Sequence, residues 1–227
     1  MNSDNQRRDW STGEYWQGRF DSGDTPWELN APSKVLFEAL SHVFPGENSL
    51  KGLSALSPGC GSGSDAIELA RRGASVVAVD WSPAATSRLR VRLANYSAND
   101  LSSMVSVISG DFFAAQPIAV DLVCEHTFFC AIDPAMRCRY KEAILKWLKK
   151  GGYLVGNFFV LTEEEIDKLS GKSLTKDSLG PPFASSEREL REMFSPEFEL
   201  VELRPSKSGE PDRRLGLEWV GVFRSLG

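Results

Sequence analysis

Glycines occupy alternate positions in one short stretch of the chain, at Gly59, Gly61 and Gly63. Glycine lets the backbone turn sharply and approach a bound molecule where a Cβ atom would collide. Asp80 follows nineteen residues after Gly61, at the end of an apolar run, where its carboxylate can accept hydrogen bonds from a ribose diol. The residue types and their spacing predict a site for a ligand that contains adenosine.

The residues around these glycines predict the elements that position the site. Residues 53–80 change from an apolar run to helical spacing and back, which predicts strand, glycine turn, helix and strand. The same glycines match the dinucleotide fingerprint, so NAD is one alternative, and a structural turn without a ligand is another. Asp65 falls in the first helical turn, where its charge would repel a pyrophosphate. S-adenosylmethionine carries an ammonium and a sulfonium instead, so the local charge favours it.

Composition limits the class of protein. The chain has 227 residues, a net charge of −5 and no basic run longer than two residues, which predicts one domain (1–227), a small-molecule substrate and no nucleic-acid partner. The four cysteines lack zinc-site spacing, so we expect reduced thiols, no metal and a cytoplasmic location. No leader or long apolar run is present, so we expect no membrane insertion, and we expect a monomer or a weak dimer.

Aromatic residues crowd the N-terminal segment of residues 1–30. Large rings stand at Trp10, Tyr15, Trp16, Phe20 and Trp27. One interpretation is that the rings bury themselves as core and anchor the segment. The other is a lid that excludes water from the site and favours a sulfonium through the quadrupoles of the rings.

The rest of the chain alternates helices and strands. We expect helices at 33–43, 83–96, 134–150 and 187–194, and strands at 105–113, 120–125, 153–161, 198–203 and 217–223. The last two strands can close the sheet antiparallel at one edge. Residues 162–186 are polar, which predicts a flap over the substrate or a plain surface insertion. The prediction is a Rossmann-like, doubly wound, seven-stranded, mostly parallel α/β sheet with an antiparallel C-terminal strand.

Two strand ends carry further candidate residues. Asp111 and Phe112 end the third expected strand, where they suit the edge and face of an adenine, although Asp111 alone can cap a turn. The fourth expected strand leads through Glu125 and His126 into two phenylalanines at 128 and 129. Ligands of open α/β sheets lie beyond the carboxyl ends of the strands, so this loop should border the reacting centre.

The order of these motifs resembles a class I S-adenosylmethionine-dependent methyltransferase over most of the chain. The spaced aromatic residues with Gly23–Trp27, the motif Pro58–Gly61 and the run Thr127–Pro134 resemble the thiopurine S-methyltransferase family more narrowly. The halide and thiol methyltransferases are the most similar branch. Gly180–Phe183 and Leu215–Trp219 are also similar to members of that branch.

The resemblance implies a role for each matching position. It places the methionine part of the cofactor against Trp16, Phe20 and Trp27, its backbone along Gly59 and Gly61, its ribose on Asp80 and its adenine at Asp111 and Phe112, with Glu125 following at the end of the fourth strand. Two positions depart from the family pattern. Phe20 stands where a second tryptophan is usual, and His126 stands where the halide and thiol members usually have tyrosine.

The departure at His126 leaves two kinds of acceptor open. A thiolate, bisulfide or halide needs no base, only proximity and a dry cavity, which Phe128 and Phe129 can supply. An oxygen or nitrogen acceptor needs a proton acceptor, and His126 is the histidine placed to be one. The sequence therefore predicts methyl transfer from S-adenosylmethionine to a small thiol, sulfide or halide-type acceptor, with an O- or N-methyltransferase as the alternative and an NAD-linked oxidoreductase as a further one.

Overall fold

The computed structural model describes residues 10–46, 49–96, 101–172, 180–208 and 217–227. Three parts of the predictions lie outside these ranges. They are residues 1–9 of the predicted lid, residues 173–179 of the predicted flap, and Leu215 and Gly216 of the last family motif.

One seven-stranded sheet forms the centre of the protein, with the strand order β3-β2-β1-β4-β5-β7-β6. The strands are β1 (Ser54–Pro58), β2 (Ser75–Asp80), β3 (Val105–Ser109), β4 (Val120–His126), β5 (Leu148–Phe159), β6 (Phe198–Pro205) and β7 (Glu218–Ser225). Strands β1 to β5 pair in parallel, and β7 runs antiparallel between β5 and β6. The predicted fold class, including the antiparallel end of the sheet, is confirmed.

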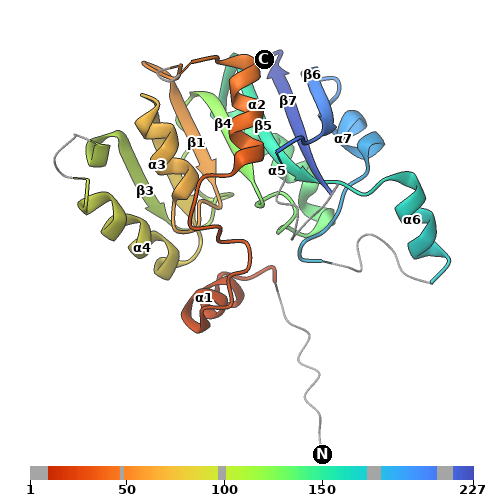
Figure 1. Cartoon of the computed structure of the whole chain (residues 1–227), viewed down its shortest axis with the longest axis horizontal. Coiled ribbons are helices and arrows are strands. Elements are labelled where there is room, and N and C mark those ends of the chain that lie inside the picture. The colour runs from red at the N-terminus through yellow and green to blue at the C-terminus, as the bar shows by residue number, and fades with distance from the viewer. Residues whose placement is uncertain (1–9, 47–48, 97–100, 173–179, 209–216) are drawn as a thin grey trace, which may run out of the picture.

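Helices cover both faces of the sheet (Figure 1). Helices α2 (Lys34–Val43), α3 (Ser64–Arg71) and α4 (Pro83–Ala94) contribute to one apolar cluster with residues of β1, β2 and β4. Helices α5 (Arg137–Trp147) and α7 (Glu187–Phe194) pack into the other cluster, which is rich in aromatic rings. Helix α2 begins after Ser33, whose hydroxyl accepts a hydrogen bond from the Leu36 N–H.

Helix α1 (Gly13–Ser22) lies outside the two layers that cover the sheet and packs against α4. Figure 1 shows it beyond the carboxyl ends of β1 and β3. The Thr12 hydroxyl caps its first turn, and Gly23, with a φ of 72°, ends it in the left-handed conformation that glycine adopts without strain. The aromatic N-terminal segment is therefore placed at the edge of the sheet where ligands of this fold class bind.

The predicted boundary between the helix at 134–150 and the next strand is wrong. A short 3₁₀ helix spans Pro134–Met136, α5 ends at Trp147, and β5 already begins at Leu148. Leu148 pairs with Val120 of β4, and the register between the strands shifts before the next pair. Gly151, with a φ of 78°, lies in this irregular part of the strand, and Gly152 follows it, so both glycines stand inside β5 rather than after the helix.

The predicted flap contains a helix that we did not expect. Helix α6 spans Glu163–Ser170 and starts with a capping box between Thr162 and Glu165. A second 3₁₀ turn, η2 (Leu101–Met104), precedes β3. Across the ranges described above, no helix combines the length and the apolar character that crossing a membrane requires.

Candidate functional site

A large cavity opens beyond the carboxyl ends of the parallel strands. Its volume is about 510 Å³, within the range usual for small-molecule sites. Most of its wall is apolar. Aromatic rings from three parts of the chain form much of this wall. They are Trp16, Phe20 and Trp27 of the N-terminal segment, Phe112 after β3 and Phe128 after β4. The structure therefore brings together predicted residues that lie more than a hundred positions apart in the sequence.

A second, smaller and more polar cavity adjoins the large one. Both cavities are lined by Trp27, Gly59 and Thr127. The small polar cavity adds Gly61 and His126 to these shared residues, together with Glu28, Cys60 and Asp65. A ligand can thus extend from an apolar compartment past the glycine turn into a polar one.

The glycine turn has the backbone shape that its sequence predicts. Gly59 and Gly61 have φ values of 57° and 54°, a region that residues with a Cβ atom rarely adopt. A Cβ atom on Gly59 would also lie 2.5 Å from the Cδ2 atom of Phe128. Glycine at this position therefore allows the turn and the wall of the large cavity to pack against each other.

Asp80 ends β2 and is nearly buried at the boundary of the large cavity. Its Oδ2 atom accepts a hydrogen bond from the Gly61 N–H at 2.8 Å, and its Oδ1 atom accepts one from the Ser82 N–H at 2.8 Å. Burial raises the pKa of this carboxyl to about 6, the two N–H donors oppose the rise, and the nearby charge of Glu28 adds to it. The carboxylate is held in a fixed orientation and can accept further hydrogen bonds on its free lone pairs.

The predicted adenine residues meet at the same cavity. Asp111 accepts a hydrogen bond from the Phe113 N–H through Oδ1 at 2.9 Å, so it caps the turn and lines the cavity at once. Phe112 is buried and contributes one wall. Trp81, which the sequence analysis missed, also lines the cavity and is 39% exposed. Because Trp81 directly follows Asp80, the sequence could have predicted that it borders the site.

Three contacts hold the N-terminal segment against the glycine turn and against helix α4. The Glu28 carboxylate accepts hydrogen bonds from both the N–H and the hydroxyl of Ser62. The side-chain Oε1 atom of Gln17 accepts a hydrogen bond from the hydroxyl of Ser82, at the start of α4, at 2.8 Å. The guanidinium of Arg88 donates a hydrogen bond to the backbone carbonyl of Phe20 at 2.7 Å.

The predicted aromatic residues of this segment are divided between core and cavity. Phe20 is 2% exposed, whereas Trp16 and Trp27 are only partly buried. All three line the large cavity, and the ring centroids of Trp16 and Trp27 lie 5.5 Å apart. Phe20 is therefore buried, as the first interpretation predicts, and its ring also borders the cavity, whereas a lid over a bound cofactor stays a prediction.

Glu125 lies at the end of β4 and lines neither of the two cavities. It is fully buried, and its Oε1 atom accepts hydrogen bonds from the N–H groups of Phe128 and Phe129 at 2.8 Å each. Its Oε2 atom accepts a hydrogen bond from the Tyr140 hydroxyl at 2.7 Å. Burial raises the pKa of Glu125, and the hydrogen bonds from these donors oppose the rise. Its contacts hold the loop that follows β4.

His126 lines the small polar cavity rather than the large apolar one. Its Nδ1 atom lies 2.6 Å from the Oδ2 atom of Asp65 in the first turn of α3. The loop after β4 also separates the two predicted phenylalanines. Phe128 lines the large cavity, whereas Phe129 is 2% exposed and packs on Tyr140 and Phe158 in the core.

Several lining residues were not singled out from the sequence. Arg19 lines the large cavity, donates to the Tyr15 hydroxyl at 2.9 Å and pairs with Asp24 at 2.8 Å. Met136 and Arg139 also line it without having been singled out, and Trp10, Cys130, Pro181 and Pro182, which belong to predicted segments but had no role assigned, line it too. They come from four separate segments, and their common feature, a place on the wall, is set by the tertiary structure.

The carboxylate acceptors and the rings of the site fit S-adenosylmethionine. Asp80 and Asp111 supply carboxylate acceptors for a ribose and an adenine, the rings supply apolar walls, and the turn at Gly59 admits a ligand close to the backbone. Asp65 occupies the start of α3, where a pyrophosphate would need positive potential. In the ranges that the structure covers, no group of three or more metal-ligating side chains was found.

Known methyltransferases are similar to this chain over most of its length. The chain is 31% identical over 211 residues to the probable thiol methyltransferase 2 of Arabidopsis thaliana, covering 92% of this chain and 84% of that protein. It is 29% identical over 196 residues to a thiopurine S-methyltransferase of Vibrio cholerae, covering 80% of each.

Among solved structures, the N-methyltransferase NodS from Bradyrhizobium japonicum superposes with a TM-score of 0.67 at 16% identity, covering 95% of this chain and 99% of NodS. That likeness shows the fold. The model of the thiopurine S-methyltransferase family matches residues 11–221. The chain therefore belongs to the thiopurine S-methyltransferase family, and it is an S-adenosylmethionine-dependent methyltransferase.

Proposed function

We propose that this enzyme methylates a sulfur nucleophile, a small thiol or bisulfide, with halides as a further acceptor type. The observation that carries the proposal is the composition of the large cavity. Among the described residues that line it, none is a histidine or a lysine, and most of the wall is apolar. An acceptor that ionises in water before it enters needs no base in such a cavity.

The proposed position of the cofactor rests on the carboxylate acceptors and rings of the cavity wall. We place the ribose at Asp80, the adenine between Asp111 and Phe112, and the methionyl part past Gly59 and Gly61, where the two cavities join. Trp16, Phe20 and Trp27 then lie on its outer side. Glu125 contributes indirectly, through the two N–H groups of the loop that it holds.

The chain's own residues do the positioning in this reaction. When bound, the cofactor supplies a methyl group activated by the positive charge of its sulfonium. The rings of Trp27 and Phe128 exclude water and favour that charge through their quadrupoles. The thiolate sulfur forms a bond to the methyl carbon as the old carbon–sulfur bond breaks and its electron pair returns to the cofactor sulfur. A thioether and S-adenosylhomocysteine result.

The names of the relatives support a sulfur acceptor. The similar proteins include a probable thiol methyltransferase, a thiocyanate methyltransferase that is 24% identical, and a thiopurine S-methyltransferase. All three names specify acceptors that attack through sulfur or carry it.

A second candidate function rests on the pair of His126 and Asp65. A carboxylate at Nδ1 orients an imidazole for proton transfer at its other nitrogen, as in many hydrolases. This arrangement suits an oxygen or nitrogen acceptor that must lose a proton. It needs such an acceptor to reach the small polar cavity, which His126 lines.

A panel assay with labelled S-adenosylmethionine separates the two candidates. Bisulfide, thiophenol, iodide, a catechol and a primary amine are tested with the purified full chain. The proposal expects methylated products from bisulfide and thiophenol. Turnover restricted to the catechol or the amine supports the second candidate and overturns the first.

We further propose that residues 1–227 act as a single domain, as a monomer or a weak dimer, in the cytoplasm. All four cysteines are free, which is consistent with a reducing compartment. Size-exclusion chromatography with light scattering tests the oligomeric state, and a stable dimer at micromolar concentration contradicts it.

A further inference from the structure

Charged side chains are unevenly distributed around the large cavity. Three carboxylates line it, from Asp80, Asp111 and Asp133, together with two guanidinium groups, from Arg19 and Arg139. Arg19 is already paired with a carboxylate. The carboxylates outnumber the guanidinium groups, so an anion can bind in this cavity only where a guanidinium group lies next to it.

Arg139 is the cavity cation that has no carboxylate partner among the described residues. It is the third residue of α5, its side chain is exposed, and its guanidinium carbon lies 4.7 Å from the centroid of the Phe113 ring. Stacking on a ring holds the planar group in one orientation while leaving its edge donors exposed. An oriented guanidinium with exposed edge donors is suited to binding a carboxylate through two parallel hydrogen bonds.

The ring beneath Arg139 continues into the wall of the cavity. The ring centroids of Phe113 and Phe128 lie 6.5 Å apart, and Phe113 also contacts Phe112 at 5.3 Å. Arg139 lies in the first turn of α5, so the positive end of the helix dipole adds to its field. The positive potential is thus located at the mouth of the compartment that Phe128 lines.

The cofactor does not account for an anion at this place. Adenosine carries none, and the methionyl carboxylate belongs with the glycine turn, where the small polar cavity lies and Arg139 does not reach. The remaining molecule that enters the large cavity is the methyl acceptor. We propose that Arg139 binds a carboxylate that the thiol acceptor carries at a distance from its sulfur, so that the preferred substrates are thiols with an anionic group at the far end. The inference rests on the proposed S-methyltransferase function.

A pair of thiols that differ at one position tests this assignment. The value of kcat/KM is measured for 4-mercaptobenzoate and for 4-methylbenzenethiol, with the wild-type chain and with Arg139→Gln. Charged hydrogen bonds at a partly exposed site predict a loss of about tenfold for the carboxylate thiol in the variant. The neutral thiol should change by less than about twofold, because it has no group for the guanidinium to bind. Arg139→Lys should restore part of the loss, since it keeps the charge but not the planar fork.

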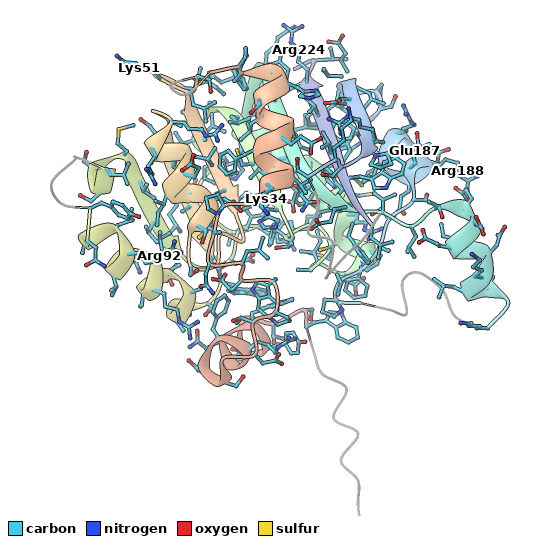
Figure 2. All side chains as sticks on the ribbon, in the orientation of Figure 1. Lys34, Lys51, Arg92, Glu187, Arg188 and Arg224 are labelled. Atoms are coloured by element: carbon cyan, nitrogen blue, oxygen red, sulfur yellow. The ribbon has the colours of Figure 1, made fainter. Side chains whose placement is uncertain are left out.

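Arg188→Gln is the matched control. Arg188 is an exposed arginine of α7, and Figure 2 shows its side chain at the outer edge of the molecule, away from α1 and Arg92. This variant removes the same charge without touching the cavity, so the ratio of the two kcat/KM values should not move. An equal loss for both thiols in Arg139→Gln, or an unchanged ratio, overturns the inference.

A binding measurement keeps the inference separate from the proposed function. Calorimetry on the enzyme saturated with S-adenosylhomocysteine gives the affinity for 4-(methylsulfanyl)benzoate, the thioether product, without any turnover. We expect about tenfold weaker binding in Arg139→Gln and no change in Arg188→Gln. If neither thiol is methylated, the S-methyltransferase proposal fails. If the thioether product binds equally well to the wild-type chain and to Arg139→Gln, only the inference about Arg139 fails.

Discussion

The Nδ1 atom of His126 lies 2.6 Å from the Oδ2 atom of Asp65, and both side chains are about nine-tenths buried, at 13% and 14% exposed. The Oδ1 atom of the same aspartate accepts a hydrogen bond from the Ser33 N–H at 2.7 Å. One carboxylate thus joins the end of β4 to the starts of α2 and α3. The pair gives His126 a role in fixing the site, whether or not it moves a proton.

Replacement of His126 by alanine should leave thiol methylation within about tenfold of the parent, since a general base typically contributes about a hundredfold or more. The measurement is kcat/KM for thiophenol at saturating S-adenosylmethionine. Asp65→Asn, which disturbs the same contact without removing the ring, serves as the comparison. A collapse of thiol turnover in His126→Ala, with intact binding of S-adenosylhomocysteine, would mean that the histidine is a base.

Cofactor binding should weaken in acid because of Asp80. Its carboxyl has a pKa of about 6, so it is ionised above that pH and protonated below it. The protonated form loses an acceptor for the ribose diol, so the Kd for S-adenosylhomocysteine should be constant above pH 6 and rise about tenfold per unit below it. Titration calorimetry between pH 5 and 8 measures this. In Asp80→Asn the affinity for S-adenosylhomocysteine should be weak and independent of pH. If that variant still loses affinity below pH 6 as the parent does, the Asp80 carboxyl is not the group that titrates.

Glu28 should set the pH below which cofactor binding weakens. Its charge raises the pKa of Asp80, and its oxygens accept from the N–H and the hydroxyl of Ser62. Glu28→Gln removes the charge and keeps an acceptor for Ser62. The pH at which cofactor binding weakens should therefore be lower in Glu28→Gln than in the parent. The same calorimetric series measures it, and a midpoint that stays or rises contradicts the electrostatic coupling.

Glu125 should matter chiefly for stability. Glu125→Ala leaves two backbone N–H groups and the Tyr140 hydroxyl without their acceptor, and each buried donor left unpaired costs about 1–3 kcal/mol. Tyr140→Phe removes one donor to the carboxylate and should cost about 1–3 kcal/mol. Urea denaturation followed by tryptophan fluorescence gives both values. Equal, small losses would show that the carboxylate does not hold the loop.

Local sequence patterns were sufficient to predict the elements around the glycine turn. The strand, turn, helix and strand of residues 53–80 follow from apolar spacing and from glycines, both of which act within a few residues. The helix that begins near residue 33 and the antiparallel strands at the end of the chain were predicted on similar grounds. The family resemblance added the roles of the aromatic residues, which spacing alone does not assign.

Tertiary contacts account for what was missed. Helix α1 contains Gly13 and Gly18, which lower helix propensity, yet it forms where Trp81 packs against Gly13. The early start of β5 follows from pairing with β4. Arg139 lines the cavity because the start of α5 lies against Phe113, in the segment that follows β3, a placement that no local pattern encodes. The capping box of α6 was readable and was overlooked.

A competition assay tests the central claim most directly. Equimolar thiophenol, phenol and aniline are offered together with labelled S-adenosylmethionine, and the products are identified by mass spectrometry. A cavity whose described wall holds no histidine or lysine should methylate the acceptor that ionises unaided, so labelled methyl phenyl sulfide should dominate. Labelled anisole or N-methylaniline as the main product would contradict the account.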